Sequence, residues 1–397
     1  MAGGSGKACL LVTNLFPPAL GGSAEVYAAL SSHAQGEIVV LTSSHDHQNG
    51  QAWEGWREFD RRAAYPIHRL TCIRPFFRKA YRGLFYRLHE AATAFKLVMA
   101  VLRLARRYRV DAICVADDET LGWLVWISRF LLGRRSLIYC HGDDLHVRDK
   151  DVPGRSRWLR LAHHVVAANR YAAGLLATRF AVAQDRVLLI ENGVDLALFG
   201  PEAPPQSFVE RHGLGGRQVL LTVTRLVPRK GVDKSLEAMP AVARLFPAAL
   251  YVIVGDGPQR SELEALAGKL GIAERVKFMG AMPHGETVNF YRCAQLVLLP
   301  NREEQGEADG LPLVFLEAGA CAKPVIGGKA GGTAEVVVDG VNGRLIDGRH
   351  AEEIAAAIGD LLADEGRRRT MGEKGLAMAR NRGWNARTQT FLACCRG

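Results

Sequence analysis

The chain has 397 residues, of which 48% are hydrophobic and 23% are charged, with a formal net charge of +10 at pH 7. This composition predicts a globular protein of about two or three domains. No apolar run reaches the roughly 18 residues of a membrane helix, no secretory signal precedes the first expected strand, and the eight cysteines lack metal-ligand or CxxC spacing, which favours reduced thiols in a cytoplasmic protein.

The first half of the chain alternates between apolar runs and helical patterns, which predicts a first α/β domain over residues 1–199. The expected strands are 8–13, 37–42, 112–116, 136–140, 165–168 and 187–190. Helices are expected from Ser23 as an N-cap, over 76–109 and 121–132, and from Asn169. Residues 43–56 are expected to be a polar loop, and residues up to 65 give no clear pattern.

Two sites in this half could contact a ligand. Gly21 and Gly22 lie between the first strand and its helix, where glycine lets a phosphate approach the backbone, although turns use such pairs more often. His141 ends an expected strand, just before Gly142; a lone histidine is more often structural. Asp143 and Asp144 follow, and two adjacent carboxylates without further ligands do not indicate a metal site.

The basic charge is concentrated in one segment. Residues 57–109 carry 14 Lys and Arg against three acidic residues, so the rest of the chain is close to neutral. On a helical wheel, apolar side chains gather on one side and the cations on the rest. The apolar side is Phe77, Tyr81, Leu84, Phe85 and Leu88; the cations are Arg78, Lys79, Arg82, Arg87, Lys96, Arg103, Arg106 and Arg107. Residues 76–109 could therefore lie on an anionic membrane, or the apolar side could pack on the core.

A proline-rich linker, 200–205, precedes a second α/β domain over residues 200–379. Its expected strands are 219–224, 250–254, 276–280, 296–300 and one from Pro324; its expected helices start at Val232, Pro312 and Thr333 and include 351–364 and 370–379. A last helix is expected over 384–395, beyond this domain. Arg225 and Lys230 follow the first of these strands. A guanidinium fork and an ammonium projecting together from a strand end favour a diphosphate, although basic loops are usually only solvated.

The segment from Asn301 to Ile326 carries the most specific pattern. Asp309 ends an acidic loop, and Glu317 lies eight residues later in the helix that Pro312 opens. The amides of Gly310, Leu311 and Leu313 would be free to meet an anion. A carboxylate there suits the hydroxyls of a ribose or sugar; equally, the two acids could only complement the helix dipole.

These residues resemble the signature of glycosyltransferase family 4, two acidic residues eight apart before a small-residue helix and a Pro-Val strand. Aspartate at 309 replaces the usual glutamate and shortens its reach by one methylene. His141, Arg225 and Lys230 match family positions too, as do Asn192-Gly193-Val194-Asp195 and the last helix. The resemblance implies the α/β GT-B fold: two Rossmann-like domains facing across a cleft, with residues 380–397 crossing back to the first.

The resemblance also implies roles. Gly21, Gly22, Arg225 and Lys230 would lie at the donor diphosphate; Glu317 would hold the ribose; Gly280 and Met282 would lie beside the base. Asp309 and His141 would position the sugar.

The expected function is transfer of a sugar, with retention, from a UDP- or GDP-sugar to a hydroxyl of an acceptor that the sequence does not identify; a lipid-linked or other glycoconjugate acceptor fits. No metal or cofactor is expected, and the enzyme would be cytoplasmic or peripheral on the inner membrane face. Alternatives are a nucleotide-sugar epimerase, a disaccharide phosphorylase, or a nonenzymatic nucleotide-sugar-binding protein. A nucleic-acid binder is not expected, because no aromatic-basic motif is present.

Overall fold

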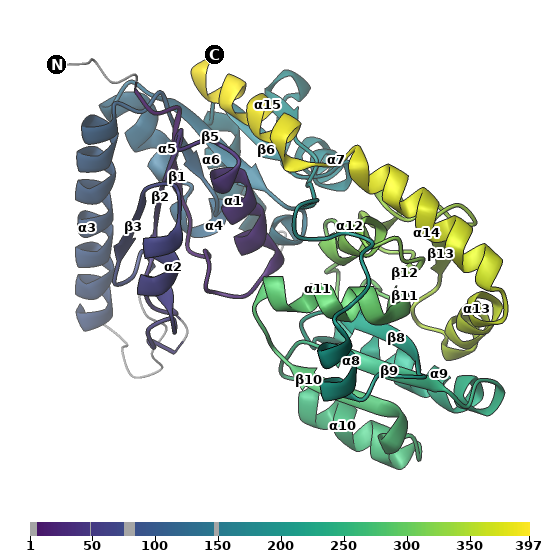
Figure 1. Ribbon diagram of the computed structural model, residues 1–397. Helices are drawn as coiled ribbons and strands as arrows, with labels where there is room; N and C mark the ends of the chain where they lie inside the picture. The colour runs from purple at the N-terminus through teal and green to yellow at the C-terminus, as the bar shows by residue number, and fades with distance from the viewer. Residues whose placement is uncertain (1–5, 48, 75–83, 147–150) are drawn as a thin grey trace. The chain divides into compact units, whose positions relative to one another are not determined.

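The computed structural model describes residues 6–47, 49–74, 84–146 and 151–397, which form two compact units (Figure 1). Unit 1 is Met1–Glu191 with Trp384–Gly397, and unit 2 is Asn192–Gly383. The sequence analysis places the divisions after residues 199 and 379, and the structure places them after 191 and 383.

Unit 1 is built on a seven-stranded parallel sheet in the order β3-β2-β1-β4-β5-β6-β7. Its strands are β1 Cys9–Val12, β2 Ile38–Ser43, β3 Ile67–Leu70, β4 Ala112–Val115, β5 Arg135–Cys140, β6 His164–Ala167 and β7 Val187–Leu189. Its helices are α1 Gly22–Ser32, α2 Trp56–Arg62, α3 Leu84–Tyr108, α4 Asp118–Leu121, α5 Leu124–Trp126, α6 Val152–Leu161, α7 Arg170–Thr178 and α15 Trp384–Arg396. The central strands are buried along their length, which explains their apolar sequences.

Three expectations in unit 1 need correction. The patternless segment before residue 70 forms α2 and the edge strand β3, whose residues are only half-buried and so give a weak signal. The helix expected over 121–132 is divided into α4, α5 and a π-helical turn at Ile127–Leu131. The N-cap of α1 is Gly21 and not Ser23. Of the expected basic helix over 76–109, residues 76–83 lie outside the described residues.

Unit 2 repeats the architecture with a six-stranded parallel sheet in the order β10-β9-β8-β11-β12-β13. Its strands are β8 Gln218–Val223, β9 Ala249–Val254, β10 Val276–Gly280, β11 Ala294–Leu299, β12 Val325–Gly328 and β13 Gly343–Ile346. Its helices are α8 Gln206–His212, α9 Val232–Leu245, α10 Arg260–Lys269, α11 His284–Cys293, α12 Leu313–Ala320, α13 Ala351–Ala363 and α14 Glu365–Arg380.

Alternate residues of each strand in unit 2 pack on opposite faces of its sheet. Leu250 and Val252 of β9 join one hydrophobic cluster, whereas Tyr251 and Ile253 join the other. This is the two-residue period of a strand covered on both faces. Such a sheet leaves the carboxyl ends of its strands as the edge where polar loops gather.

Several details differ from expectation in unit 2, where helices α8, α10 and α11 are not among the expected elements. The helix expected at Thr333 is a single turn, Thr333–Glu335. Strand β13 was not predicted. Helix α14 begins at Glu365, since Asp364 caps it by accepting a hydrogen bond from the amide of Arg367. Pro312 is the N-cap of α12 and not its first residue.

The last helix, α15, packs in unit 1 as the resemblance implies. The ring of Phe391 lies 6.3 Å from that of Tyr139 in β5. The Arg387 Nε donates a hydrogen bond of 2.8 Å to the carbonyl of Glu191. The end of the chain is therefore part of the first unit's core.

Candidate functional site

Two loops at the carboxyl edge of the unit 2 sheet meet at the carboxylate of Asp309. Lys230 Nζ lies 2.8 Å and Arg229 Nε 3.0 Å from its Oδ1. Asp309 is 5% exposed. Arg229 and Lys230 come from the turn after β8, and Asp309 from the loop after β11. The sheet therefore brings together groups about 80 residues apart in sequence, and Arg229, which the sequence analysis leaves without a role, is one of them.

Asp309 is charged in this setting and has one oxygen unused. Burial raises the pKa of its carboxyl, but Lys230 and Arg229 outweigh burial, and the net pKa lies below its usual range. Its Oδ2 is buried and has no hydrogen-bond partner among the described residues. A buried, unsatisfied oxygen is costly in a folded protein, so Oδ2 is well suited to accept a hydrogen bond from a ligand.

The glycine-rich turn after β12 holds this acidic loop from behind. Gly331 has φ +56°, and a Cβ there would lie 1.8 Å from the carbonyl oxygen of Asp309. The amide of Gly332 donates a hydrogen bond of 3.2 Å to that same carbonyl. Any side chain at 331 would displace the loop. The glycines of this turn therefore serve close packing against the acidic loop.

Free backbone donors lie next to Asp309. The amides of Gly310, Leu311 and Leu313 donate no hydrogen bond to any described residue, and α12 begins at Leu313. Arg225 follows β8, and its exposed side chain forms no ion pair with the described part of the chain. The edge therefore offers free amides and three cations, Arg225, Arg229 and Lys230. Two carboxylates oppose them, those of Asp309 and of Glu307, which lies 3.5 Å from Arg229. This surplus of positive charge suits an anion.

Glu317 lies in the second turn of α12 and is held by two residues of α11. His284 Nε2 lies 2.8 Å from its Oε1, and the Tyr291 hydroxyl donates to its Oε2 at 2.5 Å. Burial and the charge of Glu317 raise the pKa of Tyr291 well above its usual value, so the phenol stays a donor. Each carboxylate oxygen keeps a second lone pair, and Glu317 is 6% exposed. It can still accept from a diol.

The loop that was expected to contact a base leads into that same helix. Gly280 has φ +78° and accepts a hydrogen bond of 2.8 Å from the amide of Gly255. Met282 packs against the hydrophobic cluster that contains Phe315 of α12. The loop from Gly280 ends at His284, the first residue of α11. Because His284 contacts Glu317, this loop and the acid belong to one part of the site. No sequence pattern indicates His284 or Tyr291 as partners of Glu317.

In unit 1, His141 sits at the end of β5 in a network of buried polar groups. Its Nε2 lies 2.8 Å from the hydroxyl of Tyr27 in α1, and Asn169 Nδ2 donates to its carbonyl at 2.7 Å. Burial lowers the pKa of His141 to about 4, against the smaller opposing effect of Asp143. The imidazole is therefore neutral near pH 7. Gly21 and Gly22, at the start of the same helix α1, are exposed.

Asp144 fixes the turn that carries His141. Its Oδ1 accepts hydrogen bonds from the amides of His141, at 3.0 Å, and Gly142, at 2.8 Å. Burial, with the charges of Asp143 and Asp118, raises the pKa of Asp144 to about 8. The sequence analysis treats the Asp143-Asp144 pair as isolated, but the fold places further groups beside Asp144.

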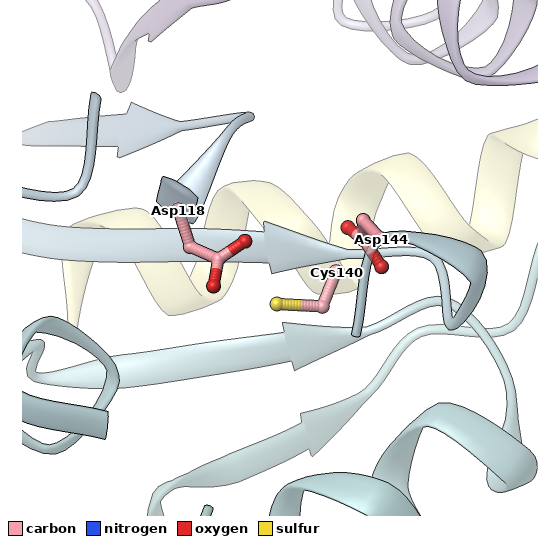
Figure 2. A group of neighbouring side chains, drawn as sticks. All are labelled: Asp118, Cys140 and Asp144. Atoms are coloured by element: carbon pink, nitrogen blue, oxygen red, sulfur yellow. The ribbon is translucent and has the colours of Figure 1, made fainter. Parts of the chain in front are cut away.

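Figure 2 shows Asp144 with Asp118 and Cys140, the sulfur directed toward Asp118; their ligand atoms all lie within 4.8 Å of one another. Arg155 donates to both oxygens of Asp118, through Nε at 2.7 Å and through a terminal nitrogen. Burial and both carboxylates raise the pKa of the Cys140 thiol well above its usual value. A thiol must lose its proton to bind a metal ion. The cluster thus resembles a buried ion pair that supports the His141 turn more than it resembles a metal centre.

Comparison with known proteins gives consistent matches. A family model described as glycosyl transferases group 1 matches residues 206–378, and one described as Glycosyltransferase Family 4 matches residues 21–198. A GDP-mannose-dependent alpha-(1-6)-phosphatidylinositol monomannoside mannosyltransferase of Mycolicibacterium smegmatis is 31% identical over 387 residues, which are 96% of this chain and 95% of that protein. A D-inositol 3-phosphate glycosyltransferase of Salinispora tropica is 33% identical over 76% of this chain and 66% of its own.

Solved structures share the fold. Anabaena HepE in complex with UDP and glucose has a TM-score of 0.79 at 21% identity and covers 98% of this chain and 99% of its own. Sucrose-phosphate synthase from Thermosynechococcus elongatus has a TM-score of 0.77 at 23% identity, with 98% of each chain covered. At these identities the likeness concerns the fold alone, and it confirms the expected GT-B fold. An epimerase, a phosphorylase or a nonenzymatic binder finds no support in these comparisons.

The neutral state of His141 makes a testable prediction about stability. In the unfolded chain a histidine binds its proton near pH 6.5, whereas folded His141 does so near pH 4. Between these values the unfolded state holds more protons, so the free energy of unfolding falls as the pH is lowered. Between pH 7 and 5 we expect the wild type to lose about 2 kcal/mol more than His141→Gln, which cannot titrate there. Urea unfolding at both pH values measures this, and equal losses would contradict it.

Proposed function

Because this chain belongs to glycosyltransferase family 4, we propose that it transfers mannose from GDP-mannose, with retention of configuration, to an acceptor that carries a phosphorylated inositol. That it is a glycosyltransferase using a nucleotide-diphosphate sugar rests on its family and relatives. The choice of mannose, of guanine and of inositol is supported by the names of relatives such as those from Mycolicibacterium smegmatis and Salinispora tropica.

The observation that carries the proposal is the buried, partnerless oxygen of Asp309 beside a surplus of cations. A sugar hydroxyl donating to Oδ2 would satisfy that oxygen. The diphosphate would then meet Arg225, Lys230 and the amides of Gly310 and Leu311. Lys230 can serve both partners, because an ammonium has three donors and only one is used on Asp309.

Charge stabilisation of the leaving diphosphate is the largest expected contribution to the rate. Preorganised cations and amides act most strongly where negative charge develops, on the oxygen that leaves the sugar. The same charges take the place of a divalent ion, so we propose that turnover needs none. His141, neutral and held by Tyr27, would help to position the sugar, as the family resemblance implies.

Retention of configuration is proposed from the family resemblance, and the state of the buried carboxylates favours a retaining route without a covalent intermediate. Asp309 is held by Lys230 and Arg229, and Glu317 by His284 and Tyr291. A carboxylate that accepts hydrogen bonds from two donors is a poorer nucleophile than a free carboxylate. Both are therefore better suited to hold hydroxyls than to form a covalent intermediate. The acceptor hydroxyl would attack on the face from which the diphosphate leaves and pass its proton to that oxygen.

The outer face of α3 supports contact with a membrane. Leu84, Leu88, Phe95 and Met99 lie on one face of the helix and are 71%, 57%, 66% and 50% exposed. Arg87, Lys96 and Arg103 are exposed along its flanks. The opposite face, with Leu97, Val101 and Leu104, packs in the core. Core packing is therefore wrong for Leu84 and Leu88.

Five residues of the predicted apolar and basic faces lie outside the described residues, as does the side chain of Phe85: Phe77, Tyr81, Arg78, Lys79 and Arg82. Arg106 and Arg107 are exposed in the last turn of α3. No helix in the described part of the chain is long and apolar enough to span a bilayer. We propose peripheral binding of α3 to an anionic membrane at the cytoplasmic face, where each cation adds about 1 kcal/mol.

Removing either cation from the proposed diphosphate site should reduce turnover. We expect Lys230→Ala and Arg225→Ala each to lower kcat with GDP-mannose by roughly 10²–10³. Arg217→Ala is the matched control, since this exposed arginine lies at the opposite end of β8. Released GDP is measured by mass spectrometry, with UDP-glucose and UDP-galactose in parallel and with a chelator added. Normal turnover in both variants, or turnover abolished by the chelator and restored by magnesium, would contradict the proposal.

The two carboxylates should affect different parts of the donor. We expect Glu317→Gln to weaken the binding of both GDP and GDP-mannose, because it contacts the ribose. Asp309→Asn should weaken GDP-mannose and spare GDP, because it contacts the sugar. Titration calorimetry with both ligands decides between them. Equal losses for both ligands in both variants would show that the roles are not separate.

Membrane binding through α3 is tested by co-sedimentation at low salt. Wild-type protein should pellet more with vesicles containing phosphatidylglycerol than with pure phosphatidylcholine. Leu88→Glu and Phe95→Glu should abolish the difference, because each puts a negative charge at the interface. Leu245→Glu is the control, since Leu245 is 68% exposed in unit 2. If all three variants pellet like the wild type, α3 does not bind the membrane.

A further inference from the structure

Unit 1 contains a hollow of about 800 Å³ that the proposed donor site does not use. It is lined by residues that follow β2, β3 and β4 and by the inward face of α3. The carboxyl edge of a parallel sheet is where α/β proteins bind ligands. The volume falls within the ~300–1,000 Å³ typical of small-molecule sites.

One wall of the hollow carries donors for an anion. Arg74, just after β3, lies 3.6 Å from Asp117 through one terminal nitrogen, so most of its five N–H donors remain for a ligand. His47, after β2, lies in the same lining, and burial and the charge of Arg74 lower its pKa. A neutral imidazole beside a guanidinium can donate to an anion without repelling the arginine.

Two carboxylates face the hollow from other sides. Glu90 comes from α3 and Glu119 from α4. Both are exposed, and neither forms an ion pair with a described residue. A carboxylate only accepts hydrogen bonds, so these two suit hydroxyl groups and would repel a second phosphate.

An aromatic side chain that is held by a hydrogen bond also lines the hollow. Trp123 lines the hollow, and its Nε1 donates a hydrogen bond of 2.9 Å to the carbonyl of Thr120. Thr120 in turn donates to Asp117 at 2.6 Å, the same aspartate that meets Arg74. Asp117 therefore links the arginine, the threonine and, through it, the indole, which fixes the lining before any ligand arrives.

We propose that this hollow binds the acceptor as a cyclic polyol that bears one phosphate, a proposal that rests on the proposed function. Arg74 and His47 hold the phosphate. Glu90 and Glu119 accept hydrogen bonds from ring hydroxyls, and Trp123 lies against the C–H face of the ring. The phosphate can belong to a soluble molecule or to a lipid headgroup.

The position of α3 connects this site with the membrane face. Tyr86, Glu90 and Thr93 line the hollow from its inward side, and Leu88 and Phe95 are exposed on its outward side. A helix lying in a lipid interface would therefore present its other face to the headgroup of a lipid beside it.

Titration calorimetry of the full chain with myo-inositol 1-phosphate tests the proposal without any transfer reaction. We expect Arg74→Gln to weaken this binding about tenfold or more, since a charge-assisted hydrogen bond is lost. Arg74→Lys should retain part of the affinity, and Glu119→Gln should weaken it with an intact phosphate contact. Arg134→Gln, which removes an exposed arginine before β5, should leave it unchanged.

The lipid source is tested with vesicles. Phosphatidylcholine vesicles containing phosphatidylinositol are compared with vesicles that contain the same fraction of phosphatidylglycerol, which has the charge but no ring. A preference for phosphatidylinositol that Arg74→Gln removes supports the proposal with a lipid acceptor. If neither probe binds, or if Arg74→Gln and Glu119→Gln bind both probes like the wild type, the proposal is wrong. GDP binding is measured in the same samples. A protein that binds GDP but neither probe would support the proposed donor site and contradict only the proposed acceptor site.

Discussion

The ion cluster of Asp309 with Lys230 and Arg229 is the interaction on which the donor half of the molecule depends. Two cations compensate one buried carboxylate through a single oxygen, and they leave the other oxygen without a partner. Breaking such a buried cluster is strongly destabilising because a charge is left uncompensated. The cluster therefore orders two loops and at the same time keeps one acceptor available. Glycines behind it make this possible, since a side chain at Gly331 would collide with the loop.

A similar design appears in unit 1, with neutral groups in place of charged ones. His141 is kept uncharged by burial and is oriented by Tyr27, Asn169 and Asp144. Beneath it, the ion pair of Asp118 with Arg155 is buried beside Asp144. Each unit thus presents a fixed polar group at the carboxyl edge of its sheet and supports it with a buried network. A rigid support of this kind lets a short side chain act at a defined position.

Much of the fold could be predicted from the sequence, because buried parallel strands are continuous apolar runs. The central strands of both sheets, such as 112–116 and 250–254, are recognised within a residue or two. The edge strands β3 and β13 are not, because they are short, half-buried and interrupted by polar residues. The edge strands β7 and β10 are also half-buried but are recognised. Helix α2 escapes detection for a related reason, since none of its residues is buried.

For the site, the sequence identifies residues whose type and spacing carry the chemistry, such as Lys230 and Asp309. It does not identify partners that come from distant loops. The pairing of Glu317 with His284 and Tyr291 has no local pattern, and Arg229 is passed over beside Lys230. The glycines of 327–332 indicate a turn, but their close packing against Asp309 depends on a loop about 20 residues earlier in the chain.

The most direct test is a crystal structure with GDP-2-deoxy-2-fluoromannose, a donor whose fluorine slows departure of the diphosphate. We expect a sugar hydroxyl within roughly 2.5–3.0 Å of Asp309 Oδ2, with the diphosphate against Arg225 and Lys230. A donor bound elsewhere, or bound with Oδ2 still without a partner, would contradict the central claim that the Asp309 cluster forms the sugar site.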